Sequence, residues 1–202
     1  MTSLGAVDRS RILRRRGLVL EWVTLAWNVV GVIVLAVLAV SASSTALAGF
    51  GLDSLIEIGA STVVLWELSG AGEQRQRRAL RLIGVAFIAV AAYLLVQSVI
   101  ALITQHHPGG SWRGMIWTAV TALSMFTLAW MKSRTGRALG NPVLQTEGHV
   151  TFIDGLLAVA VLLGVGLNTV LGWWWADPLA GLVIVYYAIR EAVEIFKPET
   201  RP

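Results

Sequence analysis

The sequence predicts an all-α, polytopic membrane protein, a bundle of six transmembrane helices with both termini in the cytoplasm. Three observations predict this fold class. Of the 202 residues, 56% are hydrophobic and 14% are charged, whereas charged residues make up about a quarter of an ordinary soluble domain. Six apolar stretches approach the roughly 20 residues that a spanning helix needs. Basic residues gather at every second connection between these stretches.

The predicted spans occupy most of the chain, so we expect one transmembrane domain over residues 1–202. A basic N-terminal segment, 1–16, comes before the spans, and a short tail, 197–202, follows them. The apolar run that follows RILRRR is longer than the hydrophobic core of a secretory signal peptide and lacks a clear cleavage site. It is therefore interpreted as the first span. The spans are expected at residues 17–40, 44–67, 80–104, 114–131, 144–171 and 176–196.

The basic residues give the predicted orientation. They lie before the first span, between the second and third, between the fourth and fifth, and around the end of the sixth, whereas only Arg113 lies elsewhere. Six spans place all these groups on one side, which the positive-inside rule makes the cytoplasm of a plasma-membrane protein. Lys132, Arg134 and Arg137 count here as a cytoplasmic connection. Topology and anionic lipid headgroups explain this basic charge, so no nucleic-acid partner is expected.

The turns on the predicted outer side are short and carry interfacial residues. They contain SASST, QHHPGGSW and GWWWADP, and their tryptophans fit anchors at the headgroup level. Asp177 and Pro178 are interpreted as the start of the sixth span, with Asp177 as a helix cap. Ala176 and Ala180 have the small-xxx-small spacing that permits close helix contact.

Buried polar residues concentrate in three of the predicted spans. Asp53 and Glu57 are four residues apart in the second span and therefore lie about 40° apart around the helix. Glu147, Thr151 and Asp154 follow the i, i+4, i+7 pattern in the fifth span and form one stripe. In the first span, the comparable stripe consists of Glu21, Thr24 and Asn28.

The depth of these groups in the bilayer points to a cation site. An ionised aspartate at the centre of a span costs roughly 2.5–3.5 kcal/mol on insertion scales, and we expect no lysine or arginine at that depth. The compensating charge then has to come from a metal cation or from protons. The groups near the bilayer middle are Asn28, Asp53, Glu57 and Asp154, and those nearer the cytoplasmic face are Glu21, Glu67 and Glu147.

Other interpretations of single residues stay open. A lone intramembrane acid also serves as a protonated hydrogen-bond partner at a helix interface, and Glu21 and Glu147 also fit side chains that reach the inner interface. His106 and His107 fit either an outer-loop metal capture pair or plain loop residues. His149 is expected to point away from the acidic stripe.

Two stretches resemble the cation diffusion facilitator family. STALAGFGLDSLIEIGAS is similar to that family's second helix, with its pair of metal-binding residues four apart, here Asp53 and Glu57. HVTFIDGLLAVAVLLGVGLNTVLGWWWADPLAGLVI is similar to its fifth and sixth helices. The resemblance implies six transmembrane helices, exchange of divalent metals for protons, and a homodimer. Val150 stands where the family usually has His or Asp, so Glu147 is considered as a substitute. The family's cytoplasmic metal-binding domain is not expected after KPETRP.

The resulting hypothesis is a divalent cation transporter that exports metal by alternating access in exchange for protons. Metal passes Glu21 at the entrance and binds Asp53, Glu57 and Asp154, with Asn28 and Glu147 as further ligands. The all-oxygen set favours manganese, iron or magnesium, whereas the resemblance favours zinc, so the ion stays open. The alternatives are a proton-coupled carrier without metal, a non-transporting metal sensor and an intramembrane aspartyl protease. No enzymatic activity is expected.

Overall fold

The computed structural model describes residues 2–68 and 73–197, and this part of the chain is all-α. Its six helices run antiparallel to their neighbours along the chain. They are α1 Thr2–Ala42, α2 Thr45–Leu68, α3 Glu73–Ile103, α4 Trp112–Leu139, α5 Pro142–Leu171 and α6 Ala176–Phe196.

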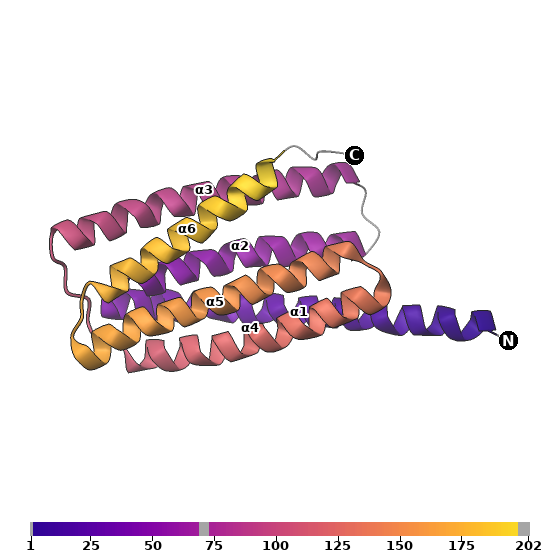
Figure 1. The fold of residues 1–202 in the computed structure, drawn as a ribbon, viewed down its shortest axis with the longest axis horizontal. Helices are drawn as coiled ribbons and strands as arrows, with labels where there is room; N and C mark the ends of the chain where they lie inside the picture. Colours follow the sequence, from indigo (N-terminus) through magenta and orange to yellow (C-terminus); the bar gives the residue numbers. More distant parts are fainter. Residues whose placement is uncertain (1, 69–72, 198–202) are drawn as a thin grey trace.

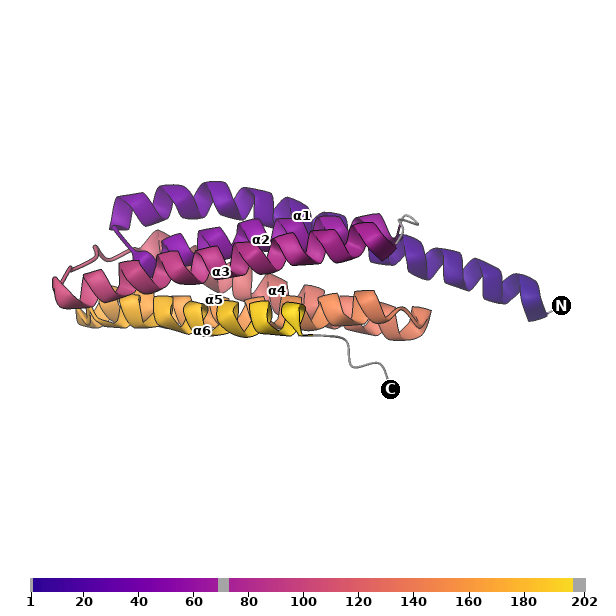
Figure 2. The same cartoon turned by 90° about the horizontal axis from the view of Figure 1, so that it is seen from above.

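The helices form a long bundle of two layers, with α1, α2 and α3 in one layer and α4, α5 and α6 in the other (Figure 2). The most extensive contacts join α4 to α5, α1 to α2 and α3 to α6. The α1–α2, α3–α4 and α5–α6 connections lie together at one end, here called the α1–α2 end (Figure 1). The α4–α5 connection lies at the opposite end, the α4–α5 end. The N-terminal part of α1 extends past the bundle there.

Four helical stretches of the described residues are long and apolar enough to cross a bilayer. They are Ser10–Ala42, Thr45–Trp66, Trp112–Leu139 and Glu147–Leu171. In α3 the described apolar stretch is shorter, Ala91–Ile103, while α6 carries Asp177 near its start and Arg190, Glu191 and Glu194 near its end.

Some helices extend beyond the predicted spans. The range 44–67 agrees closely with α2 and 176–196 with α6, because a short connection precedes each helix. By contrast, α4 continues to Leu139, eight residues past the predicted end. Hydropathy marks the apolar part of a helix, whereas the backbone hydrogen bonds continue through a charged flank. The extension of α4 carries Lys132 into the bundle.

The turn between α4 and α5 is specified by its sequence. Gly140 ends α4 with a φ of 66°, a left-handed conformation that glycine adopts without strain. Asn141 caps α5 by accepting a hydrogen bond from the N–H of Leu144 at 2.9 Å, and Pro142 occupies the first turn, where no N–H is needed. This tight turn keeps α4 and α5 side by side.

The expected close helix contact at Ala176 and Ala180 is confirmed. These alanines of α6 face Gly164 of α5, where an added Cβ would lie 2.6 Å from the Cβ of Ala180 and 2.9 Å from the carbonyl oxygen of Ala176. The backbones of α5 and α6 therefore touch at this point.

The role expected for Asp177 as a cap of α6 is wrong. The N-cap of α6 is Trp175, which makes no side-chain cap hydrogen bond. The carboxylate of Asp177 instead accepts hydrogen bonds from the Ser44 and Thr45 hydroxyls and, at 3.2 Å, from the N–H of Ala46. Because these groups lie at the start of α2, Asp177 caps α2 from a neighbouring helix.

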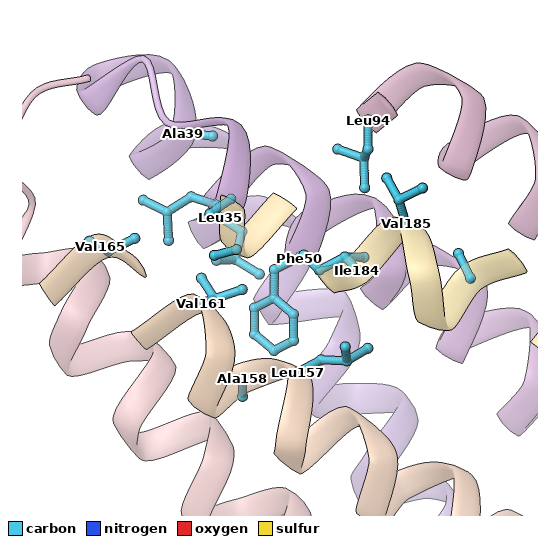
Figure 3. Packing of buried hydrophobic residues seen from close by; sticks show 14 of the residues in the cluster. Leu35, Ala39, Phe50, Leu94, Leu157, Ala158, Val161, Val165, Ile184 and Val185 are labelled. Atoms are coloured by element: carbon cyan, nitrogen blue, oxygen red, sulfur yellow. The ribbon is translucent and has the colours of Figure 1, made fainter. Parts of the chain in front are cut away.

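An apolar core fills the bundle beside the buried polar groups. Phe50 of α2, Leu157 and Val161 of α5 and Ile184 of α6 pack together with Leu35 of α1 (Figure 3). Phe50 lies three residues before Asp53, and Leu157 lies three residues after Asp154. The core therefore separates these two acids from the α1–α2 end.

Candidate cation site

The acidic pair of α2 lies inside the bundle. Asp53 is 6% exposed and Glu57 is 4% exposed. Because the two residues are one turn apart in a continuous helix, both carboxyl groups leave α2 on the same face. The small polar residues Ser54 and Ser61 are also buried on α2.

The polar stripe of α5 is buried as well. Glu147, Thr151 and Asp154 are all buried, whereas His149 is exposed, which confirms that His149 points away from the stripe. The carboxyl groups of Glu57 and Asp154 are close enough to interact, although they come from different helices. The structure thus brings the acids of α2 and α5 together.

The stripe of α1 completes the polar interior. Glu21 and Thr24 are fully buried and Asn28 is 5% exposed. The Asn28 side-chain nitrogen donates to the backbone oxygen of Thr24 at 3.1 Å, and the Thr24 hydroxyl donates to the backbone oxygen of Leu20 at 3.0 Å. These bonds hold the side chains of Thr24 and Asn28 against the backbone of α1.

A buried lysine corrects the expectation that the acids lack a built-in counter-charge. The Lys132 side chain is fully buried, and its ammonium donates to a Glu21 oxygen at 3.1 Å and to a Glu147 oxygen at 3.2 Å. It also donates to the Thr151 hydroxyl at 3.1 Å. Glu21 and Glu147 therefore form ion pairs with this lysine of α4.

The helical repeat of α4 indicates that Lys132 lies on the buried face of this helix. The buried positions Thr121, Met125 and Leu128 are followed by Lys132 and Thr135 on the same face, as the 3.6-residue repeat requires. The sequence analysis did not predict the burial of Lys132, because it grouped this residue with Arg134 and Arg137 as one solvated connection. Of these three residues, only Arg134 and Arg137 are exposed.

Two carboxyl oxygens in this interior accept no hydrogen bond from the described residues. They are Oε1 of Glu21 and Oδ2 of Asp154. Thr151 connects Lys132 to Glu57. Its hydroxyl accepts a hydrogen bond from Lys132 and donates one to Oε1 of Glu57, at 3.5 Å. A buried acceptor without a donor is costly, so these oxygens suit an added cation or proton.

The excess of acid is large even with the lysine. Lys132 supplies the one buried ammonium of this interior among the described residues, and it pairs with two acids, Glu21 and Glu147. The buried carboxyl groups here are five: Glu21, Asp53, Glu57, Glu147 and Asp154. In this conformation, no three described His, Asp or Glu side chains are grouped so that they could hold a metal ion together.

The other predicted residues lie away from this interior. His106 and His107 are exposed in the connection between α3 and α4, and the His107 ring lies 5.1 Å from the Trp174 ring. The side chain of Glu67 lies outside the described residues. Trp112, Trp173 and Trp175 are exposed at the α1–α2 end.

The fold and the site define a class: a polytopic helical membrane protein with a carboxylate-rich interior. The model of the cation efflux transmembrane domain matches residues 81–201, from α3 through α6. The chain therefore belongs to the cation efflux, or cation diffusion facilitator, family, whose members are transporters rather than enzymes. The matched range contains Lys132, Glu147 and Asp154, while Asp53 and Glu57 lie before it.

Individual relatives agree with this family. The chain is 23% identical over 188 residues to Transmembrane protein 163 of Xenopus laevis, covering 88% of this chain and 66% of that protein. It is 25% identical to an uncharacterized transporter of Synechocystis, covering 79% of this chain and 57% of that one. A cadmium, cobalt and zinc/H(+)-K(+) antiporter of Bacillus velezensis is 24% identical, covering 56% of this chain and 36% of the antiporter. The chain thus spans about a third to two thirds of these curated relatives.

Proposed function

We propose that this protein carries divalent metal cations across the plasma membrane by alternating access and exchanges them for protons. The observation that carries the proposal is the burial of three carboxyl groups from two facing helices, Asp53, Glu57 and Asp154, together with the unpartnered oxygen of Asp154. Acids placed inside a membrane bundle mark ion pathways.

The proposed binding step uses the oxygens of α2, α5 and α1. Asp53, Glu57 and Asp154 supply carboxylates, and Asn28 supplies an amide oxygen. Because these ligands are not grouped around one point in this conformation, metal binding would draw α2 and α5 together. When the cation leaves, the crowded carboxyl groups repel one another and take up protons. Metal and protons then compete for the same atoms.

The proposed topology places six spans in the bilayer with both termini in the cytoplasm. The α4–α5 end then faces the cytoplasm, and the α1–α2 end faces outward. Support for this orientation comes from the exposed Arg134 and Arg137 near the α4–α5 end. Hydrogen bonds close the other end: Gly109 N–H to the Ala42 oxygen at 2.7 Å, the Asn168 amide to the Pro108 oxygen at 2.9 Å, and the cap of α2 by Asp177. This conformation is therefore closed on the proposed outer side.

The transported metal follows from ligand chemistry and from the relatives. Oxygen ligands favour manganese, iron or magnesium, whereas the name of the Bacillus relative gives cadmium, cobalt and zinc. The three histidines are exposed, so the proposed site has no imidazole ligand. We propose a homodimer from the family resemblance, with manganese, zinc and iron as the metals to test first.

The test is metal uptake by reconstituted vesicles under an imposed pH gradient, with a panel of divalent cations. We expect wild-type protein to transport at least one metal, and Asp53→Asn and Asp154→Asn to abolish transport. His149→Ala is the matched control, because this residue lies next to the stripe but is exposed. Transport by both acid variants at the wild-type rate would refute the site. Proton flux without any metal flux would favour the metal-free carrier.

A further inference from the structure

The Lys132 ammonium is a cation that this bundle already holds. Its three N–H donors match its three acceptors, Glu21 at 3.1 Å, Glu147 at 3.2 Å and Thr151 at 3.1 Å. The acceptors come from α1 and α5, whereas the lysine comes from α4. The ammonium thus joins three helices at the side of the polar interior toward the α4–α5 end.

We propose that the Lys132 ammonium is a built-in competitor of the transported cation. It occupies the carboxylates of Glu21 and Glu147, and a divalent cation that moves toward Asp154 has to displace it. This inference rests on the proposed function of the same site. Two positive charges repel strongly in a poorly screened interior, so the lysine and a dication do not share these two carboxylates.

The contacts around Lys132 indicate that a cation which displaces it moves toward the acids of α2 and α5. Thr151 accepts from Lys132 and lies 3.5 Å from Glu57, so withdrawal of the ammonium releases a hydroxyl that touches the mid-membrane acids. One unpartnered oxygen belongs to Glu21, which pairs with Lys132, and the other belongs to Asp154, three residues after Thr151 on α5. A dication that displaces the ammonium therefore gains the oxygens of Glu21 and comes within one helical turn of Asp154. Movement of Lys132 reports this displacement.

The chain offers a direct readout, because Lys132 and Lys197 are its only lysines. The Lys132 side chain is 0% exposed, whereas the Lys197 side chain is 62% exposed. Purified wild-type protein is treated with a small amine-reactive reagent, with and without saturating Mn²⁺ or Zn²⁺, and the labelling of each lysine is measured by mass spectrometry. We expect metal to increase labelling of Lys132 severalfold and to leave Lys197 unchanged. Equal or stronger protection of Lys132 in the metal-bound protein would overturn the inference.

A second measurement uses variants and calorimetric titration with the same metals. Lys132→Met keeps the length of the side chain and removes its charge, so we expect about tenfold tighter metal binding because one repelling positive charge is gone. Lys197→Met is the matched surface control, because this side chain is 62% exposed, and it should bind metal as the wild type does. Equal or weaker binding by Lys132→Met would overturn the competitor inference while the proposed function stands. No metal binding by wild-type protein would remove both.

Discussion

The hydrogen bonds of Asp177 across the α1–α2 end predict a large loss of stability in Asp177→Ala. The carboxylate is 1% exposed and accepts from the hydroxyls of Ser44 and Thr45 and from the N–H of Ala46. Removing it leaves three donors at the start of α2 without this acceptor. Hydrogen bonds to a charged group are worth roughly 1.5–3 kcal/mol each.

The expected net loss is smaller than the sum of these bonds. The variant no longer buries a carboxylate, and relief of that desolvation offsets part of the loss. We therefore expect the free energy of unfolding to fall by about 2–4 kcal/mol, in line with the loss of a helix cap plus additional charged hydrogen bonds. Denaturant titration of the detergent-solubilised protein, followed by circular dichroism, measures this change.

Asn141→Ala is the matched control for this measurement. Asn141 caps its own helix through one hydrogen bond from Leu144 N–H, at 2.9 Å, so its loss should lower the free energy of unfolding by about 1 kcal/mol. A loss in Asp177→Ala no larger than that in Asn141→Ala would refute the assignment of Asp177 as a cap between helices.

Three further predictions follow from the same contacts. Gly164→Leu should lower the free energy of unfolding by about 1–3 kcal/mol, because even a Cβ overlaps α6 there; a stability equal to wild type would contradict the close approach. Thr151→Val should lower it by about 1–3 kcal/mol through lost buried hydrogen bonds, whereas exposed Thr62→Val should change it by under about 0.5 kcal/mol. Because the chain has no cysteine, His106→Cys and Ala138→Cys each introduce a single thiol. These two variants should react with an impermeant thiol reagent from opposite sides of the membrane, and labelling of both variants from the same side would contradict the proposed topology.

Sequence reasoning predicted the helical architecture well where short turns bound apolar runs. The range of α6 was predicted without error, because GWWW precedes it and charged residues follow. The predicted end of α4 was too early. The apolar run stops before Lys132, whereas the helix continues to Leu139. The all-α class and the family resemblance are confirmed.

The polar interior was predictable only in part. Spacing within one helix placed Asp53 with Glu57 and Glu147 with Asp154, because the 3.6-residue repeat is a local property. Partners from distant helices are not local, so neither the ion pairs of Lys132 nor the cap that Asp177 provides to α2 could be read from spacing. The role of Asn28 as a metal ligand stays a prediction.

The most direct test of the central claim is X-ray absorption spectroscopy of purified protein loaded with one equivalent of manganese or zinc. Buried carboxylates and an amide are the proposed ligands, and the described histidines are exposed. We predict a first shell of oxygen atoms with no imidazole signal, and loss of that bound metal in Asp154→Asn. An imidazole signal, or an unchanged metal environment in Asp154→Asn, would contradict the account.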